Sequence, residues 1–190
     1  MPANPNTDDK KARIYAEAIA AYAGDDRDQL VRYYDELRVI FNEYRQENKL
    51  QHAFDANYET PEKRAEMART IFEPISPGLK DVLVEMAARG DLHIMHFVAE
   101  EYKYLAEERL GAVLVTVTTA VELDDHLRDV ITRKLEKDFG TDIIIREFVD
   151  RSIIGGIIMS AHGKRIDASI ASQLEASRVA LSATPTGGER

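Results

Sequence analysis

The chain has 190 residues, of which 44% are hydrophobic and 31% charged, a balance typical of an ordinary globular protein and unlike that of a disordered chain. Its formal net charge is -9, so we expect it to disfavour nucleic acids and anionic membranes and to prefer basic or amphipathic protein segments. It has no cysteine, which excludes disulfides, thiolate metal sites and cysteine nucleophiles and suits a reducing cytoplasm.

The first half of the chain has helical periodicity from Asp8 to about residue 108. We expect one helix over residues 8–24 and a longer one from Asp25 and Asp26, whose carboxylates suit a helix N-terminus, to about residue 48. Apolar spacings of three and four predict stripes of Ile14, Ala18 and Ala21 or Tyr22 on the first helix, and of Leu30, Tyr33, Tyr34, Leu37, Phe41 and Tyr44 on the second.

Helix-start and helix-stop residues predict four more helices in this half. A short helix over residues 50–54 precedes one that Thr60 and Pro61 begin, because threonine favours the N-cap and proline the first helical position. The last two helices are expected from Ser76 to Gly90 and from Asp91 to about residue 107. The first half is therefore predicted to be a six-helix bundle.

The second half begins with alternating residues 113–118, which predict a strand. Asp124 and Asp125 start a helix that Gly140 ends, with an inward stripe of Leu127, Val130, Ile131, Leu135 and Phe139. Strands over 143–149 and 157–161 follow, and Gly163-Lys164 turns the chain toward Ile166. Asp167 or Ser169 is expected to cap a final helix with the stripe Ile170, Leu174, Ser177 and Leu181, which completes a β-α-β-β-α unit.

The predicted fold class is thus α+β, in three segments. Residues 1–107 form the helical bundle, residues 108–182 the small β-α-β-β-α domain, and residues 183–190 a disordered tail. Residues 1–107 carry 14 Lys and Arg against 21 Asp and Glu, a net charge of -7, whereas the remainder carries only -2. An electropositive partner should therefore prefer the first half.

A metal site is one alternative hypothesis, because His93, His96 and Glu100 fall at helical spacings of three and four and could share a face. The competing interpretation is that these are ordinary boundary side chains, since a closed zinc site needs four ligands. A metal-dependent helical-bundle enzyme built on these three residues stays as the alternative function.

No other motif points to catalysis or to a cofactor. Gly155-Gly156 lacks the lysine and hydroxyl of a phosphate-binding loop and is better explained as a tight backbone path between two strands. Carboxylates fall at helix starts and on polar faces, and no nucleophile motif is present. We therefore expect no catalytic residue, no metal and no cofactor.

Several segments resemble the delta subunit of F-type ATP synthase, whose mitochondrial counterpart is the oligomycin-sensitivity-conferring protein. The second half carries VTVTTAVEL at 115–123, LEKDFG at 135–140, DRSIIGGI at 150–157 and DASI at 167–170, and the first half carries ARIYAEAI at 12–19 and ARGDL at 88–92. The segment with Gly155 and Gly156, followed by Asp167 and Ser169, is the most specific. Glu122 and Arg151 stand where the family usually has proline, which affects turn rigidity rather than the fold.

The resemblance implies a non-catalytic stator subunit in the peripheral stalk, which links the F1 head to the b-subunit stalk of F0 and resists rotor torque. It implies one copy per complex, on the cytoplasmic face of a bacterial cell membrane. The negative charge and the lack of a basic patch already predict that there is no nucleic-acid partner. No apolar run approaches the ~20 residues of a membrane span, so membrane association should be indirect.

The partners that the resemblance implies are the alpha-subunit N-terminal helices for the first domain and the C-terminal region of the b subunit for the second. An apolar groove that takes an amphipathic helix is the expected mode of binding. By family analogy the groove lies between the first and fifth helices and is made by Ile14, Tyr15, Ala18, Leu79, Val82, Leu83 and Met86. Core residues share this pattern, so each of the seven could equally be part of the hydrophobic core.

Overall fold

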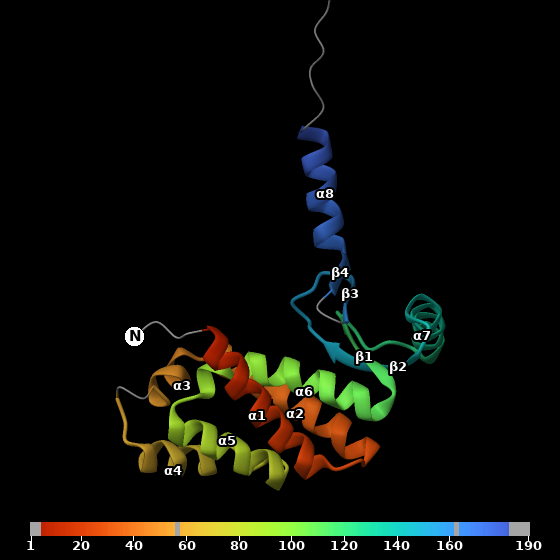
Figure 1. Ribbon diagram of the computed structural model, residues 1–190. Coiled ribbons are helices and arrows are strands. Elements are labelled where there is room, and N and C mark those ends of the chain that lie inside the picture. The colour runs from red at the N-terminus through yellow and green to blue at the C-terminus, as the bar shows by residue number, and fades with distance from the viewer. Residues whose placement is uncertain (1–4, 56–57, 162–163, 183–190) are drawn as a thin grey trace, which may run out of the picture. The chain divides into compact units, whose positions relative to one another are not determined.

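The computed structural model describes the backbone of residues 5–55, 58–161 and 164–182, with the side chains of 7–55, 58–161 and 164–178. The chain divides into two compact units, Met1–Leu110 and Gly111–Arg190. The first is helical and the second holds a small mixed sheet, so the predicted α+β class is confirmed (Figure 1). The predicted tail, 183–190, lies outside the described residues, and among the described helices none is long and apolar enough to cross a membrane.

The described part of the first unit contains α-helices and one short 3-10 helix, η1, all joined by short connections (Figure 1). Helix α1 packs mainly on α6 and α5, α2 packs on α6, and α4 packs on α5. Their bounds are α1 Pro5–Ala23, α2 Arg27–Gln46, α3 Asn48–Ala53, α4 Pro61–Ile71, α5 Pro77–Arg89, η1 Leu92–Ile94 and α6 Met95–Leu110.

Local capping explains most of the helix ends. The Asp26 carboxylate accepts from the Gln29 amide at 2.9 Å, and the Thr60 hydroxyl accepts from the Lys63 amide at 3.4 Å. Gly90 ends α5 with φ +75°, a left-handed conformation that glycine adopts without strain. Ser76 does not cap α5 with its side chain; instead its hydroxyl donates to Glu36 at 2.8 Å.

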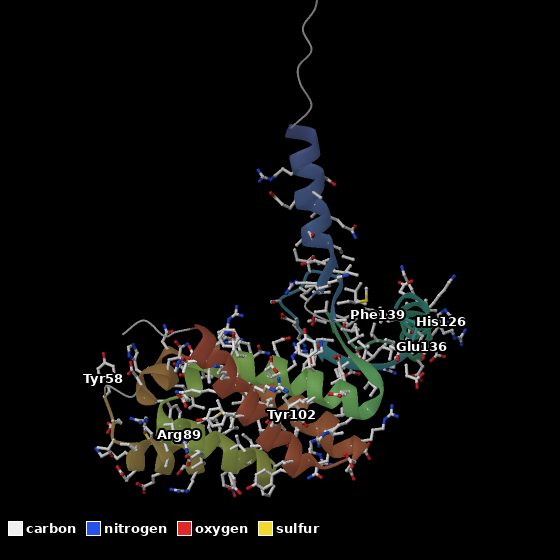
Figure 2. The ribbon with its side chains drawn as sticks, viewed as in Figure 1. Tyr58, Arg89, Tyr102, His126, Glu136 and Phe139 are labelled. Atoms are coloured by element: carbon white, nitrogen blue, oxygen red, sulfur yellow. The ribbon has the colours of Figure 1, made fainter. Side chains whose placement is uncertain are left out.

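Long-range polar contacts tie α6 to the other helices of the unit. Tyr102, which is fully buried near the middle of α6, donates its hydroxyl to the Leu30 carbonyl at 3.0 Å (Figure 2). Arg109, in the last turn of α6, donates from Nη1 to the carbonyls of Ala20 and Gly24 at 2.6 and 2.8 Å. The Ala20 carbonyl also accepts from the Gly24 amide at 3.1 Å, so Arg109 adds a tertiary contact to the last turn of α1.

The described part of the second unit is a four-stranded sheet in the order β2-β1-β3-β4, with two helices. β1 and β2 pair in parallel, as a β-α-β connection requires, and the other pairs are antiparallel. The sequence predicts three strands in this unit and a turn at Gly163-Lys164, whereas the structure has a fourth strand from Lys164. The bounds are β1 Ala112–Thr119, α7 Asp125–Phe139, β2 Asp142–Val149, β3 Gly156–Ala161, β4 Lys164–Ser169 and α8 Ile170–Ser182.

The core of the second unit lies between the sheet and α7, which covers one sheet face (Figure 1). Its buried members are Val113, Val115, Val117, Leu135 and Ala161, with Ile131 packed against them. The predicted inward stripe of α7 is therefore only partly right, because Leu127, Val130 and Phe139 are each exposed by more than a third.

Candidate partner-binding surfaces

The structure divides the seven residues of the predicted groove into two groups. Ile14 is 64% exposed and Ala18 is half-buried, and both lie on α1. The other five are buried in the helical unit: Tyr15, Leu79, Val82, Leu83 and Met86. A partner can reach the first two directly, whereas the five buried residues set the position of α5 against α1.

A buried polar contact fixes α1 against the loop after α5. Asp91, which is 4% exposed, accepts from the Tyr15 hydroxyl at 2.8 Å and from Lys11 Nζ at 2.7 Å. Burial and the Asp91 carboxylate raise the pKa of the Tyr15 phenol far above its usual value, so the phenol stays protonated and keeps donating. Asp91 stands at the start of a helix, as the sequence predicts, but its carboxylate does not cap that helix. The carboxylate makes this tertiary contact instead.

Close packing at the other end of α5 depends on Gly78. A Cβ at this position would lie 2.7 Å from Tyr22 of α1 and 2.8 Å from the Tyr33 hydroxyl of α2. Tyr22 is itself 54% exposed and follows Ile14 and Ala18 at four-residue spacing, on the same helix face. We call the strip formed by Ile14, Ala18 and Tyr22 the α1–α5 surface.

Charged side chains border the α1–α5 surface. Glu17 of α1 accepts from Arg13 Nε at 3.0 Å, and Glu85 of α5 accepts from Arg89, which Figure 2 shows on that helix. The Glu85 carboxylate also makes a small contribution to the raised pKa of the Tyr15 phenol on α1. The strip is thus apolar along its length with paired charges at its border.

In the second unit, the two glycines and the DASI segment meet at the base of α8. Gly156 has φ +89° and pairs with Ser169, and a Cβ on Gly156 would lie 2.7 Å from the Ser169 Cα. The Gly155 carbonyl accepts from the Ile170 amide at 3.0 Å. Only glycine combines this backbone conformation with so close an approach.

The same junction caps α8. The Ser169 hydroxyl accepts from the Ser172 amide at 3.2 Å, so Ser169 rather than Asp167 is the N-cap. Asp167 instead accepts hydrogen bonds from the Ser169 side chain and amide, which lower the pKa of its carboxyl. Beyond this first turn α8 is open: of its described side chains, residues 170–178, only Ser172 is half-buried, and Leu174 is 62% exposed.

A second polar contact holds α7 to the sheet. Glu147 of β2 accepts from the Leu123 amide and from Arg128 Nη2, the latter at 2.9 Å. The Leu123 amide, followed by Arg128, lowers the pKa of the Glu147 carboxyl. One carboxylate therefore fixes both the segment that enters α7 and the first turns of that helix.

The residues of the metal alternative do not form a site. The His93 ring lies in η1 with Nδ1 2.9 Å from the Gly90 carbonyl, while His96 packs on Phe97 at a centroid distance of 3.7 Å. Among the side chains that the structure describes, no group of three or more His, Asp or Glu could hold a metal ion. The spacing of His93, His96 and Glu100 therefore does not correspond to a ligand cluster.

Tyr22 belongs to the predicted stripe of the first helix but not to the predicted groove. Its four-residue spacing from Ala18 was the available signal. The close approach of Gly78 to Tyr22 could not be predicted from a single sequence, because it joins two helices more than 50 residues apart.

Comparison with known proteins shows which family this chain resembles over most of its length. A sequence profile of the family described as ATP synthase delta (OSCP) subunit matches residues 12–181. The "ATP synthase subunit delta" of Rubrobacter xylanophilus is 29% identical over 169 residues, which are 88% of this chain and 93% of the relative. That of Rhodopirellula baltica is 31% identical over 171 residues, which are 88% of this chain and 74% of the relative.

A solved structure shows the same fold. A chain in the mitochondrial ATP synthase hexamer of Toxoplasma gondii superimposes with a TM-score of 0.52 and 17% identity, over 92% of this chain and 98% of that one. At this identity the likeness concerns the fold alone.

Proposed function

The chain belongs to the ATP synthase delta (OSCP) subunit family, and from this premise we propose that its first unit binds alpha-subunit N-terminal helices and its second unit binds the b subunit. Members of this family are structural components of the peripheral stalk and not enzymes. The observation that carries the proposal is the α1–α5 surface, on which Ile14, 64% exposed, and Tyr22, 54% exposed, form one apolar strip with Ala18 along a single helix face.

The geometry of the α1–α5 surface suits an amphipathic helix laid along α1. Ile14, Ala18 and Tyr22 are spaced one helical turn apart and extend over two turns, so they match the apolar stripe of a partner helix of similar pitch. Ala18, small and half-buried between two larger side chains, leaves room for a partner side chain there. The excess of acidic residues in this half of the chain favours a partner with basic residues beside its stripe.

The buried members of the predicted groove support this role without touching the partner. Leu79, Leu83 and Met86 are fully buried and hold α5 in place, and Tyr15 is tied to Asp91. A strip on a helix that is already fixed in place binds at lower entropic cost than one that must first be ordered. We propose that the helices of the first unit move as one six-helix bundle when the partner binds.

For the second unit, α8 is the element that we propose to contact the b subunit. Its first turn is held by Gly155, Gly156 and Ser169, while its remaining described side chains are exposed. An isolated helix of 13 residues has little stability in water, so a partner along its exposed face would stabilise it. Attachment at two separate units is what a stator needs to resist torque.

The decisive experiment for the first unit is a titration with a synthetic alpha-subunit N-terminal peptide from the same ATP synthase, followed by calorimetry. We predict that Ala18→Glu weakens binding at least about tenfold, equivalent to ~1.4 kcal/mol, because it places an uncompensated charge in an apolar contact. The matched control is Ala176→Glu, the same change at an exposed helical site of α8. Unchanged affinity of a folded Ala18→Glu variant would remove the α1–α5 surface from the interface.

The place of the protein in the cell follows from the same proposal. We propose one copy per complex, attached through its partners to the cytoplasmic face of a bacterial cell membrane. Extraction of membranes with mild detergent should recover the protein with the alpha and b subunits, in a stoichiometry of one per rotary complex. Recovery of an intact complex without it would contradict the proposal.

A further inference from the structure

The first unit contains a second apolar groove, away from the α1–α5 surface. It lies where the end of α2, the short α3 and the turn after α4 meet, and its cavity volume is about 230 Å³. We call it the α2–α4 groove. It shares no residue with the α1–α5 surface, and its lining residues are Val39, Ile40, Glu43, Tyr44, Leu50, Phe54, Ile71, Phe72, Pro74 and Ile75.

The groove has a rigid floor and an exposed rim. Phe54 and Phe72 are both nearly fully buried and stack with their ring centroids 6.2 Å apart, and Ile40 completes the buried part. At the rim, Val39 is 51% exposed and Ile71 is 41% exposed. An apolar floor that is already in place can accept a side chain without rearrangement of the core.

The size of the groove limits what it can accept. A cavity of roughly 150 Å³ holds a benzene ring, so about 230 Å³ is enough for one aromatic or branched aliphatic side chain. Small-molecule sites occupy about 300–1,000 Å³, which is larger than this groove. A side chain that protrudes from a protein segment therefore fits better than a cofactor or metabolite.

The negative charge at the groove favours a segment that carries a positive charge. Glu43 is the one carboxylate among the lining residues, it is exposed, and within the described side chains no ion pair to it is formed. Burial, followed by the Asp55 carboxylate, raises the pKa of the Tyr44 phenol, which also lines the groove and therefore stays neutral. A cation beside the inserted side chain would be attracted by Glu43.

From this floor, volume and charge we propose that the α2–α4 groove is a docking site for a protein segment that inserts one bulky apolar side chain and places a lysine or arginine against Glu43. This site is additional to the α1–α5 surface and does not depend on what binds there. It gives the helical unit two separate points of attachment on different helices.

The test uses the full chain and a labelled model peptide of about four helical turns, with a single phenylalanine and a lysine one turn away. NMR titration should shift the signals of Ile40, Leu50, Ile71 and Ile75. Replacement of the phenylalanine by alanine, and the exposed-rim variants Val39→Asp and Ile71→Asp, should each weaken binding about tenfold or more. Val121→Asp, at an exposed valine of the second unit that belongs to neither surface, is the matched control and should leave the affinity unchanged.

Charge reversal separates recognition from non-specific attraction. Glu43→Lys should weaken binding of the lysine peptide and strengthen binding of a peptide with glutamate at the same position. Absence of this reversal, shifts confined to other helices, or no binding of either peptide would overturn the proposal. Self-association in sedimentation that Val39→Asp abolishes would also overturn it, because the groove would then be an interface between two copies of this chain.

Discussion

Substitution of Arg64 is expected to lower the stability of the fold strongly, because its buried guanidinium on α4 binds carbonyls at the end of α5. The side chain is 3% exposed; Nε donates to the Ala87 carbonyl at 2.8 Å, Nη2 to the Ala88 carbonyl at 2.6 Å, and Nη1 to the Glu59 carbonyl. Ala87 and Ala88 lie in the last turn of α5, where the helix dipole is negative, and the Ala87 carbonyl also accepts from the Gly90 amide at 3.0 Å.

The expected size of the effect follows from these three bonds. A hydrogen bond to a charged group contributes roughly 1.5–3 kcal/mol, whereas burial of the guanidinium costs several kcal/mol. We therefore expect Arg64→Ala to lower the free energy of unfolding by about 3 kcal/mol. Arg64→Lys should recover only part of this loss, because an ammonium group on a single stem cannot reach three carbonyls in the planar arrangement of a guanidinium.

Urea unfolding of the full chain, followed by circular dichroism at a helix wavelength, measures the effect. Arg69→Ala is the matched control, since Arg69 lies on the same helix but is exposed, and it should change the free energy by no more than about 0.5 kcal/mol. If Arg64→Ala costs less than about 1 kcal/mol, the three carbonyl contacts do not stabilise the fold in the way that the geometry indicates.

Three further predictions concern other contacts. Gly78→Ala should lower the melting temperature of the helical unit, because the new Cβ overlaps Tyr22 and forces the two helices apart; a melting temperature equal to that of the wild type would contradict this. Gly156→Ala should destabilise the sheet unit more than Gly140→Ala in thermal melts, since both have positive φ but only Gly156 also lacks space for a Cβ; equal losses would show that backbone strain alone decides. Glu147 has a lowered pKa in the folded state, so its contribution to stability is complete above the unfolded pKa of about 4.3 and is lost as the pH falls through the folded value. Glu147→Gln should therefore flatten the acid limb of a plot of urea midpoint against pH, and an unchanged acid limb would refute this reasoning.

Helix ends were predictable because they are set by neighbours in the sequence. Asp26, Thr60 and Asp124 cap their helices with bonds to amides three residues ahead, and Gly90 and Gly140 end theirs in the left-handed conformation. Each of these signals acts within one helical turn, so a single sequence contains all of the information that determines it.

The fourth strand could not be predicted in the same way. Lys164, Arg165 and Asp167 give it a polar composition with little β propensity. It becomes a strand because its backbone pairs with β3, which brings Ile166 opposite Met159. Tertiary pairing, not local preference, decides the structure of this segment.

The sequence indicated which helix carries the candidate partner surface, but not which of its residues are exposed. Periodicity cannot separate a core stripe from an exposed stripe on the same helix, so Ile14 and Tyr15 carried equal weight although one is exposed and the other buried. The Asp91 contact to Lys11 and Tyr15 decides which side of α1 turns inward, and it joins residues 76 and 80 positions apart. The α2–α4 groove depends in the same way on Phe54 and Phe72, from separate helix ends.

Arg109 has a mechanical consequence. It stands two positions before Gly111, where the second unit begins, and its guanidinium grips the end of α1 through two carbonyls. These two bonds add to the packing of α6 on α1 at the end of the helical unit from which the chain continues into the sheet unit. The helix that bears the exposed strip is thus anchored directly beside the point where the chain leaves its unit.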